Sequence, residues 1–192
     1  DVAGDAGGDN VYDVTVQVSD GSLTDTQAIA VTVTNVNEAS VIASNGGGAT
    51  ASVSVAENST AVTTVTSTDV DAGATATYSI VGGADAALFT IDAATGALAF
   101  VAAPDHDIAG DADADNVYDV TVQVSDGSLT DTQAIAVTVT NVNEAPVIAS
   151  NGGGATASVS VAENSTAVTT VTSTDVDAGA TASYAIVGGA DA

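Results

Sequence analysis

Carboxylates make up almost all of the side chains in this chain that could carry out chemistry. The stretch 105-DHDIAGDADADN-116 alone places five aspartates within twelve residues. The whole chain has 25 aspartates and glutamates, one histidine, and no lysine, arginine or cysteine. Ca²⁺ binds about six to eight oxygen ligands, whereas zinc and copper need nitrogen or sulfur ligands that are scarce here. The sequence therefore predicts that the acidic stretches bind calcium ions.

The net charge of −25 limits the partners that this chain can have. With no basic residue present, only protons, salt or metal ions can neutralise the carboxylates, whose repulsion destabilises a compact state. Nucleic acids and anionic membranes are bound through lysine and arginine, so we expect neither as a partner. No apolar run of about 18 residues is available to span a bilayer. We find no signal peptide, and because residue 1 is not methionine we expect a piece of a longer protein.

Enzymatic functions are poorly supported by these residues. A nucleophile needs a base and an orienting group, and the single histidine, His106, is expected to be an exposed loop residue. Paired carboxylates could suggest glycoside hydrolysis, but the chain has no tryptophan and only four tyrosines to form a sugar platform. The stretches 45-NGGGA-49 and 151-NGGGA-155 lack the lysine of a phosphate-binding loop, so we expect flexible loops. We predict no enzyme and no catalytic residue.

The sequence repeats itself with a period of 106 residues. Residues 1–86 align with residues 107–192, and the two stretches differ at six positions. These positions are Val2/Ile108, Gly7/Asp113, Gly8/Ala114, Ser40/Pro146, Thr77/Ser183 and Ser79/Ala185. A fixed period of this kind indicates a tandem array. We expect one complete unit at 41–146, the C-terminal part of a preceding unit at 1–40, and the N-terminal part of a following unit at 147–192.

Alternation of apolar and polar residues predicts the strands that must position the acidic stretches. The clearest examples are 117-VYDVTVQVSD-126 and 132-TQAIAVTVTN-141, and the Asp-Gly sequence between them predicts a hairpin. The side chains expected to point inward are Tyr118, Val120, Val122, Val124, Ile135, Val137 and Val139.

Five weaker apolar runs precede this hairpin and are expected to form further strands. They are SVSVAE (52–57), AVTTVTST (61–68), TATYSIV (75–81), ALFTID (87–92) and ALAFVA (97–102). Seven strands within about 100 residues, without a helical period, are typical of an immunoglobulin-like sandwich. We therefore predict an all-β fold, a seven-stranded antiparallel Greek-key β-sandwich, repeated in tandem.

The complete unit resembles a cadherin repeat along its whole length. The motifs that carry the resemblance are 56-AENSTAV-62, 66-TSTDVDAG-73, 77-TYSIVGG-83, 88-LFTIDAATGALAF-100, 104-PDHD-107, 122-VQVSDG-127 and 141-NVNEAP-146. The near-identical copies, the lack of lysine, arginine and cysteine, and the bias to Ala, Thr, Asp and Val are similar to the bacterial branch. There, cadherin-like repeats form the stalks of very large secreted adhesins of the RTX type. The resemblance implies an extracellular or cell-surface location.

The resemblance also implies calcium sites at the junctions between consecutive units, with ligands from both units. At the junction after the complete unit, here called the second junction, the implied ligands are Glu57, Asp105, Asp107, Asn141, Asn143, Glu144, Asp175 and Asp177. At the junction before it, the first junction, they are Asp1, Asn35, Asn37, Glu38, Asp69, Asp71 and Asp126.

The linker departs from the cadherin pattern DxNDN, because it reads NVNEA here. Asn141 and Glu144 each replace an aspartate, and the loss of one charge could lower the number of ions or weaken one site. Asp107 stands where the family has the longer glutamate. The loop 111-DADADN-116 is outside the pattern. Its aspartates, Asp111, Asp113 and Asp115, are compatible with an extra metal site and equally with a solvated acidic loop.

From these features we expect a calcium-dependent, rod-forming repeat of an extracellular adhesin, stiffened by calcium between neighbouring repeats of the same chain. Cell-surface or abiotic ligands are the further partners that such a rod implies. Two alternatives stay open: a module that binds a carbohydrate or a host protein directly, and a passive spacer in a large secreted enzyme.

Overall fold

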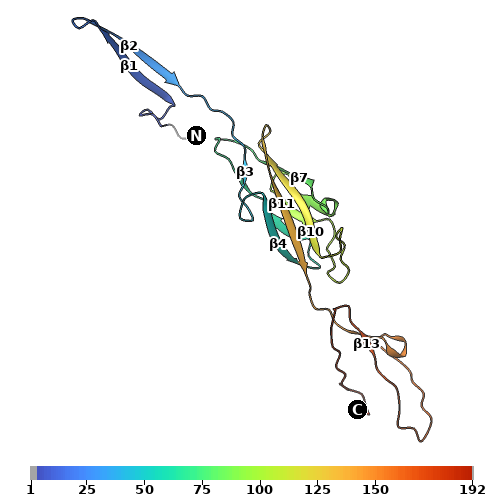
Figure 1. Ribbon diagram of the computed structural model, residues 1–192. Helices are drawn as coiled ribbons and strands as arrows, with labels where there is room; N and C mark the ends of the chain where they lie inside the picture. Colours follow the sequence, from blue (N-terminus) through green and yellow to red (C-terminus); the bar gives the residue numbers. More distant parts are fainter. Residues whose placement is uncertain (1–3, 192) are drawn as a thin grey trace.

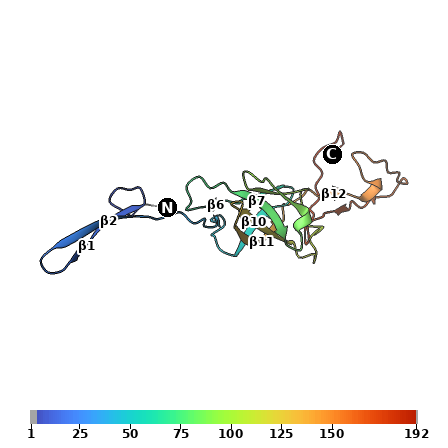
Figure 2. The ribbon, with the colours of Figure 1, turned by 90° about the horizontal axis from the view of Figure 1, so that it is seen from above.

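Strands form most of the regular structure in the computed structural model, which describes residues 4–191. Figure 1 shows a hairpin at one end of the molecule, a sandwich in the middle and a loosely paired segment at the other end. Figure 2, turned by 90°, shows the same order, so the three parts lie in a row. No helix among the described residues is long and apolar enough to cross a membrane.

The larger sheet of the central sandwich has four strands in the order β4-β11-β10-β7. Their bounds are β4 (Thr50–Ala56), β7 (Thr77–Gly82), β10 (Val117–Ser125) and β11 (Thr130–Thr140). β10 pairs with β11 and with β7 in antiparallel fashion, as predicted. β4 instead runs parallel to β11, because these two strands are joined through most of the unit rather than by a hairpin.

The second layer of the sandwich is built from shorter strands. β5, β9 and β8 form one antiparallel sheet, and β3 pairs with β6. Their bounds are β3 (Val41–Ile42), β5 (Ala61–Thr64), β6 (Ser67–Thr68), β8 (Phe89–Ile91) and β9 (Ala97–Phe100), with a 3₁₀ helix η1 (Ala86–Leu88) before β8. The run 61–68 that the sequence predicts as one strand is therefore divided between two sheets.

The core follows from the predicted alternation of the hairpin strands. All seven side chains expected to point inward are at most 2 % exposed, which confirms the prediction. Opposite them lie the buried Val65 and Leu98. Phe100 stacks on Phe89 at 4.5 Å between ring centroids and contacts Tyr118 edge-on at 5.1 Å. Because one contiguous cluster contains all these side chains, the all-β sandwich prediction is confirmed.

The loop 44–49 between β3 and β4 is held by a residue that the sequence does not mark. Gln133 is fully buried. Its side-chain nitrogen donates to the carbonyl of Gly48 at 3.1 Å, and its oxygen accepts from the Asn45 amide at 3.4 Å. The Oδ1 atom of Asn45 also accepts from Thr63 at 3.0 Å. The glycine-rich loop expected to be flexible is thus tied to β11 and β5.

The two outer parts repeat sequences of the central sandwich but lack its core. β1 (Val11–Ser19) and β2 (Thr24–Thr32) form a hairpin in the same register as β10 and β11. Residues 147–191 contain β12 (Val147–Ile148), β13 (Ser173–Thr174) and a 3₁₀ helix η2 (Ser150–Gly152). The apolar side chains of both parts are largely exposed.

Candidate metal centres at the unit junctions

Strand pairing brings the carboxylates of the second junction together. Because β4 is parallel to β11, both strands end at the same edge of the sheet, and the backbone N–H of Glu57 donates to the carbonyl of Thr140 at 3.0 Å. Glu57 therefore lies beside the linker 141–146. The loop 101–116, between β9 and β10, reaches the same edge, where Asn58 donates to the Pro104 carbonyl at 3.0 Å. The following unit approaches through Asp177.

Glu57 is the most buried carboxylate of this junction, with 3 % of its surface exposed. Its Oε1 atom accepts the N–H of Val142 at 2.7 Å, and Oε2 accepts the N–H of His106 at 2.9 Å. These two hydrogen bonds, that of Val142 first, hold the pKa of Glu57 below its ordinary value. Glu57 is thus ionised and clamps the linker to the loop.

Asp107 and Glu144 complete a cluster with Glu57. One carboxylate oxygen from each of the three residues lies within 4.8 Å of the others. Burial, followed by the charges of Asp177 and Glu57, raises the pKa of Asp107. Burial and the same two neighbours also raise the pKa of Glu144. Both carboxyls resist ionisation because burial and the negative charges around them disfavour the ionised form.

The surroundings of two oxygen atoms in this cluster show whether the cluster could bind a cation. Oδ2 of Asp107 and Oε2 of Glu144 are buried, and neither finds a hydrogen-bond donor among the described residues. Buried polar atoms are normally paired, because an unpaired one loses its water without compensation. Carboxylate oxygens with this surrounding and no basic neighbour are the donor set that a hard divalent cation requires. The residues present fit calcium.

The other predicted ligands of the second junction lie around this cluster. Asn141 donates its side-chain amide to Oδ1 of Asp177 at 2.6 Å, and the N–H of Glu144 donates to Oδ2 at 2.9 Å. These bonds, that of Asn141 first, lower the pKa of Asp177. Asp175 accepts the N–H of Asp177 at 3.1 Å.

Asp105 and Asn143 make local bonds at the same junction. Oδ1 of Asp105 accepts the N–H groups of Asp107 and Ile108 at 3.0 and 3.2 Å, which shapes the turn. The Asn143 amide donates to the carbonyl of Glu144 at 3.0 Å. Both residues keep carboxylate or amide oxygens at the junction, although the structure uses part of each side chain to fix the backbone.

The first junction repeats this geometry one unit earlier. Asn35 donates to Oδ1 of Asp71 at 2.6 Å, and the N–H of Glu38 donates to Oδ2 at 2.8 Å. The Asn37 amide donates to Asp126 at 2.9 Å, which places this aspartate at the junction as expected. The bonds from Asn35 and Glu38 lower the pKa of Asp71. The pKa of Asp126 is also lowered, mainly by the hydrogen bond from the N–H of Leu129.

Two further ligands were predicted at the first junction. Asp69 accepts the hydroxyl of Ser40 at 2.7 Å and the N–H of Asp71 at 2.8 Å. Asp1 lies outside the described residues.

The loop 111–116 forms a third acidic cluster. One carboxylate oxygen from each of Asp111, Asp113 and Asp115 lies within 4.8 Å of the others. Asp111 is buried and accepts the N–H groups of Asp115 and Asn116 at 2.8 and 3.1 Å. The hydrogen bond that Asp113 donates to Asp111 when protonated, followed by the charge of Asp115, raises the pKa of Asp113.

The preceding copy shows that this loop forms without its central aspartate. Asp5 accepts the N–H groups of Asp9 and Asn10 at 3.2 and 2.9 Å, although Gly7 stands in place of Asp113. Asn10 and Asn116 have nearly equal positive φ angles of 59° and 63°. The backbone bonds to the first aspartate therefore suffice for the loop conformation, which does not require Asp113.

Sequence reasoning missed one buried carboxylate and misjudged the histidine. Asp85 is 5 % exposed and accepts the N–H groups of Ala112 and Asp119, each at 2.8 Å, so it anchors the loop to β10. No motif marks it, since its partners lie far away in sequence. His106 was expected to be exposed, but it is half-buried, because its backbone is bound to Glu57 and to the Asn116 side chain.

The sandwich and its acidic loops define an all-β module, and comparison with known proteins shows what this module is similar to. Residues 51–140 match the family model described as "Cadherin domain". The matched segment, which is less than half of the chain, is thus similar to a cadherin domain. No curated protein sequence matches the chain.

Solved structures of protocadherins are similar to this chain in fold. One, "Protocadherin Gamma B2 extracellular cadherin domains 3-6", has a TM-score of 0.59 and 22% identity, over 88% of this chain and 43% of that one. Another, "Protocadherin gammaB7 EC3-6 cis-dimer structure", has a TM-score of 0.57 and 24% identity, over 88% and 44%. The chain thus spans less than half the length of these structures.

Proposed function

We propose that this chain is a calcium-dependent, rod-forming segment of an extracellular adhesin, with Ca²⁺ held at the junctions between its cadherin-like units. The observation that carries the proposal is the convergence of Glu57, Asp107 and Glu144 within 4.8 Å, with two buried oxygens unpaired and no lysine or arginine in the chain.

The residues of the second junction come from three places that a rod must hold together. Glu57 and Asp107 belong to the complete unit, Glu144 to the linker, and Asp177 to the following unit. Without a cation these carboxylates repel one another, which favours separation of the units. A bound Ca²⁺ supplies the positive charge that offsets this repulsion, so that binding stabilises both the fold and the relative orientation of the units.

We assign the ligands of each junction as the sequence motifs imply. The complete ligand sets are those predicted above, and the unit boundaries are 1–40, 41–146 and 147–192. Extracellular modules of this kind bind calcium with a Kd of about 10⁻⁴–10⁻³ M, so the sites would fill outside a cell and empty inside it. The uninterrupted acidity of the chain and its near-identical repeats support a surface stalk of a bacterial type. No exposed aromatic cluster favours direct binding of a sugar, among residues 4–191.

Calcium titration calorimetry tests the proposal. We expect E144Q to lower the calcium affinity of the second junction on the order of tenfold or more, because it removes one charge from an already assembled set. The matched control is D191N, which removes one carboxylate from an exposed position away from both junctions. Magnesium should bind more weakly, because it retains its water ligands. Equal calcium affinities for E144Q and D191N would refute the assignment of this junction.

The cluster of Asp111, Asp113 and Asp115 is proposed as an additional, weaker calcium site. The variant D113G copies the residue that the preceding unit carries at Gly7, so it preserves a loop sequence that forms in this same chain. We expect D113G to remove one class of weak sites from the calorimetric titration and to leave the second junction unchanged. An unchanged number of sites would identify this loop as a solvated acidic turn.

A further inference from the structure

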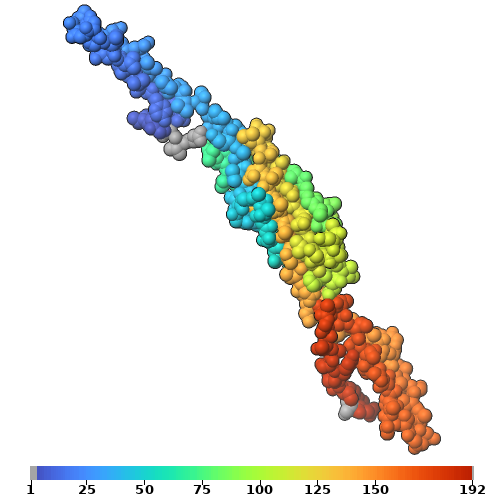
Figure 3. Space-filling view, in the orientation of Figure 1, coloured from blue at the N-terminus to red at the C-terminus, as the bar shows by residue number. Residues whose placement is uncertain are grey.

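An apolar groove of about 350 Å³, here called the side groove, opens on the central sandwich between η1 and the loop 101–116. Three large aliphatic side chains line it, Leu88, Val101 and Ile108, which are 38 %, 66 % and 74 % exposed. Single exposed aliphatic residues are ordinary on a protein surface, but several gathered around one hollow indicate a contact surface. Every lining residue lies between positions 87 and 118, a segment that Figure 3 shows, green to yellow-green, along one side of the central part.

The core of the sandwich and two hydrogen bonds hold the side groove in shape. The buried rings of Phe100 and Tyr118 line it and contact each other edge-on, at 5.1 Å between centroids. The N–H of Val101 donates to the carbonyl of Leu88 at 2.8 Å, which joins the end of β9 to η1. The N–H of Gly110 donates to the Tyr118 hydroxyl at 3.0 Å, which fixes the loop against β10. The side groove is therefore preformed.

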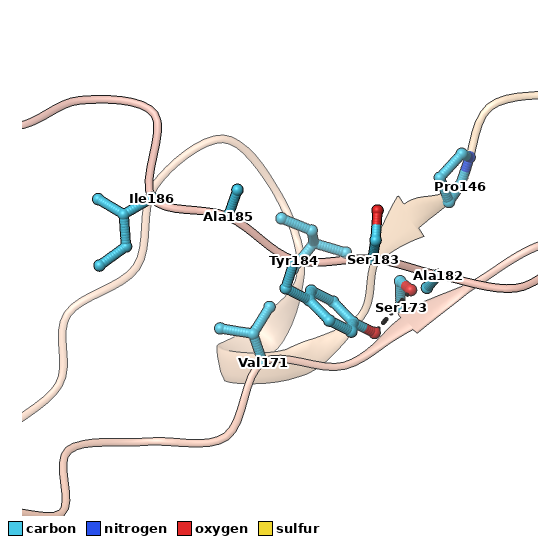
Figure 4. Close-up of a pocket in the computed structure, with 9 residues that line it drawn as sticks. Pro146, Val171, Ser173, Ala182, Ser183, Tyr184, Ala185 and Ile186 are labelled. Carbon is cyan, nitrogen blue, oxygen red and sulfur yellow. Dashed lines mark hydrogen bonds between the residues drawn. The ribbon is translucent and has the colours of Figure 1, made fainter.

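A second apolar hollow, of about 530 Å³, differs from the side groove in origin. It lies within residues 146–186, where Tyr184 lies beside Val171 (Figure 4). Their counterparts one period earlier, Tyr78 and Val65, belong to the core of the central sandwich. This second hollow is therefore core-forming surface, whereas Leu88, Val101 and Ile108 stay exposed on a sandwich that is packed.

Negative charge borders the side groove. Asp105 is exposed and lines it, and its Oδ1 atom accepts the N–H of Ile108 at 3.2 Å, so this aspartate also positions the loop that carries Ile108. Beyond Gly110, the chain continues directly into the acidic loop 111–116. No lysine or arginine of the chain can offset these carboxylates. The side groove thus combines apolar walls with a negative electrostatic potential.

The combination of walls and charge selects the occupant. A purely apolar group would leave Asp105 without a partner, and a bare metal ion would gain nothing from the aliphatic walls. A second copy of this chain has no basic residue and a net charge of −25, so repulsion opposes it. The complementary group is an apolar side chain next to a lysine or arginine. A volume of about 350 Å³ is at the lower end for ligand sites, so it suits one or two side chains.

We propose that the side groove binds a basic, amphipathic peptide segment of another protein. An apolar side chain of the segment lies between Leu88, Val101 and Ile108, and an adjacent lysine or arginine pairs with Asp105. The apolar contact supplies affinity, and the acidity of the chain accelerates the encounter with a basic partner. Calcium plays no part in this contact, so the side groove can function whether or not the junctions bind calcium.

Tryptophan fluorescence measures this binding directly, because the chain itself has no tryptophan. The probe is the peptide acetyl-Lys-Trp-Lys-amide, titrated with the full chain at low salt in chelator. We expect its emission to shift to shorter wavelength, and I108S and V101S each to lower the affinity about fivefold or more, because they remove apolar contact area. The matched control is L129S, which alters a leucine that is 43 % exposed and lies outside the side groove. It should bind the probe as the parent does.

Two further peptides separate the side groove from a general attraction of cations to an acidic chain. Acetyl-Lys-Gly-Lys-amide keeps both charges but lacks the apolar side chain, so it should not displace the probe. Acetyl-Gln-Trp-Gln-amide keeps the apolar side chain but lacks the charges, so it should bind about threefold or more weakly than the probe.

The outcomes decide between these possibilities. Equal probe affinities for the parent, I108S, V101S and L129S would overturn the proposal, as would displacement of the probe by acetyl-Lys-Gly-Lys-amide. Equal affinities for the charged and the uncharged tryptophan peptides would show that Asp105 does not select a basic partner, and would also overturn it. Ile108 and Val101 are exposed, so far-UV circular dichroism should show an unchanged thermal transition for both variants. Lost binding with an unchanged transition would support the side groove as the site.

Discussion

The side-chain nitrogen of Asn141 donates a 2.6 Å hydrogen bond to Asp177, which lies 36 residues further along the chain. Asn35 makes the same bond, of the same length, to Asp71 one unit earlier. Protein groups thus hold the linker to the segment that follows it, whereas Oδ2 of Asp107 and Oε2 of Glu144 find no hydrogen-bond donor among the described residues. The hydrogen bonds that hold the linker and the cation that would neutralise the carboxylates involve different groups. Different substitutions should therefore affect the two.

D177A should free the second junction. It removes the acceptor of both the Asn141 amide and the Glu144 N–H, together with one carboxylate near the cluster. We expect the calcium affinity to fall on the order of tenfold or more. In small-angle X-ray scattering, the distribution of distances within the molecule should broaden because the junction becomes flexible. D191A is the control for the loss of one charge. A D177A chain that stays as rigid as D191A in calcium would show that Asp177 does not join the units.

Mild acid should weaken calcium binding while it stabilises the calcium-free chain. The pKa values of Asp107 and Glu144 are raised above their ordinary values of 3.8 and 4.5, mainly through burial. An acid with a raised pKa in the folded state favours folding when protonated, so stability rises as pH falls from neutral through this window. Protonated carboxyls no longer bind calcium, so the calcium-induced increase in Tm should shrink.

Stronger acid should instead destabilise the calcium-free chain. The pKa values of Glu57 and Asp177 are lowered by hydrogen bonds, so their stabilisation is present above their ordinary values and is lost as pH falls through the folded values. Thermal melts across the pH range, with and without calcium, measure both trends. A calcium-induced increase in Tm that is constant between neutral pH and about 4.5 would exclude Asp107 and Glu144 as ligands.

A matched pair of core substitutions tests the placement of the core. Val137 is 0 % exposed and Val31, its counterpart in the hairpin, is 48 % exposed. V137A should lower the free energy of unfolding of the central unit on the order of 2 kcal/mol, because it leaves a cavity. V31A should change it by less than about 0.5 kcal/mol. Urea unfolding followed by far-UV circular dichroism gives both values, and equal values would contradict the described core.

Gly96 tests the close approach of β5 and β9 within the second layer of the sandwich. Its φ angle is +71°, and a Cβ atom there would lie 2.0 Å from the carbonyl oxygen of Val65. Gly127 also has a positive φ, of +100°, but open space surrounds it. G96A should therefore destabilise the central unit by about 1–3 kcal/mol more than G127A, which carries backbone strain alone. Urea unfolding of the two variants measures this difference, and equal losses would show that β5 and β9 do not approach as described.

The part of the fold that alternation controls could be predicted from the sequence. Residues such as Val120 and Ile135 follow a period of two, and this period fixes which side of a strand is buried but not which strand lies beside it. The parallel pairing of β4 with β11 was therefore missed. The roles of Asp85 and Gln133 were also missed, because their partners are backbone groups distant in sequence and leave no local pattern.

The candidate site was predictable to a similar extent. The motifs around Glu57, Asp107 and Asp177 could be read from their resemblance to a family, and the structure brings these three residues to one junction. The unpaired oxygens and the raised pKa values could not be read, because they arise from burial by the surrounding loops. The turn roles of Asp105 and Asn143 likewise appear only when the backbone is traced.

Thermal unfolding by far-UV circular dichroism, in excess calcium and in chelator at equal ionic strength, tests the central claim most directly. Magnesium is the control, and the far-UV range is needed because the chain has no tryptophan. We expect calcium to raise Tm strongly and magnesium to raise it little, because binding stabilises the folded state by mass action. Equal melting temperatures in calcium and in chelator would mean that the acidic junctions are solvated surfaces, and that calcium does not stiffen the rod.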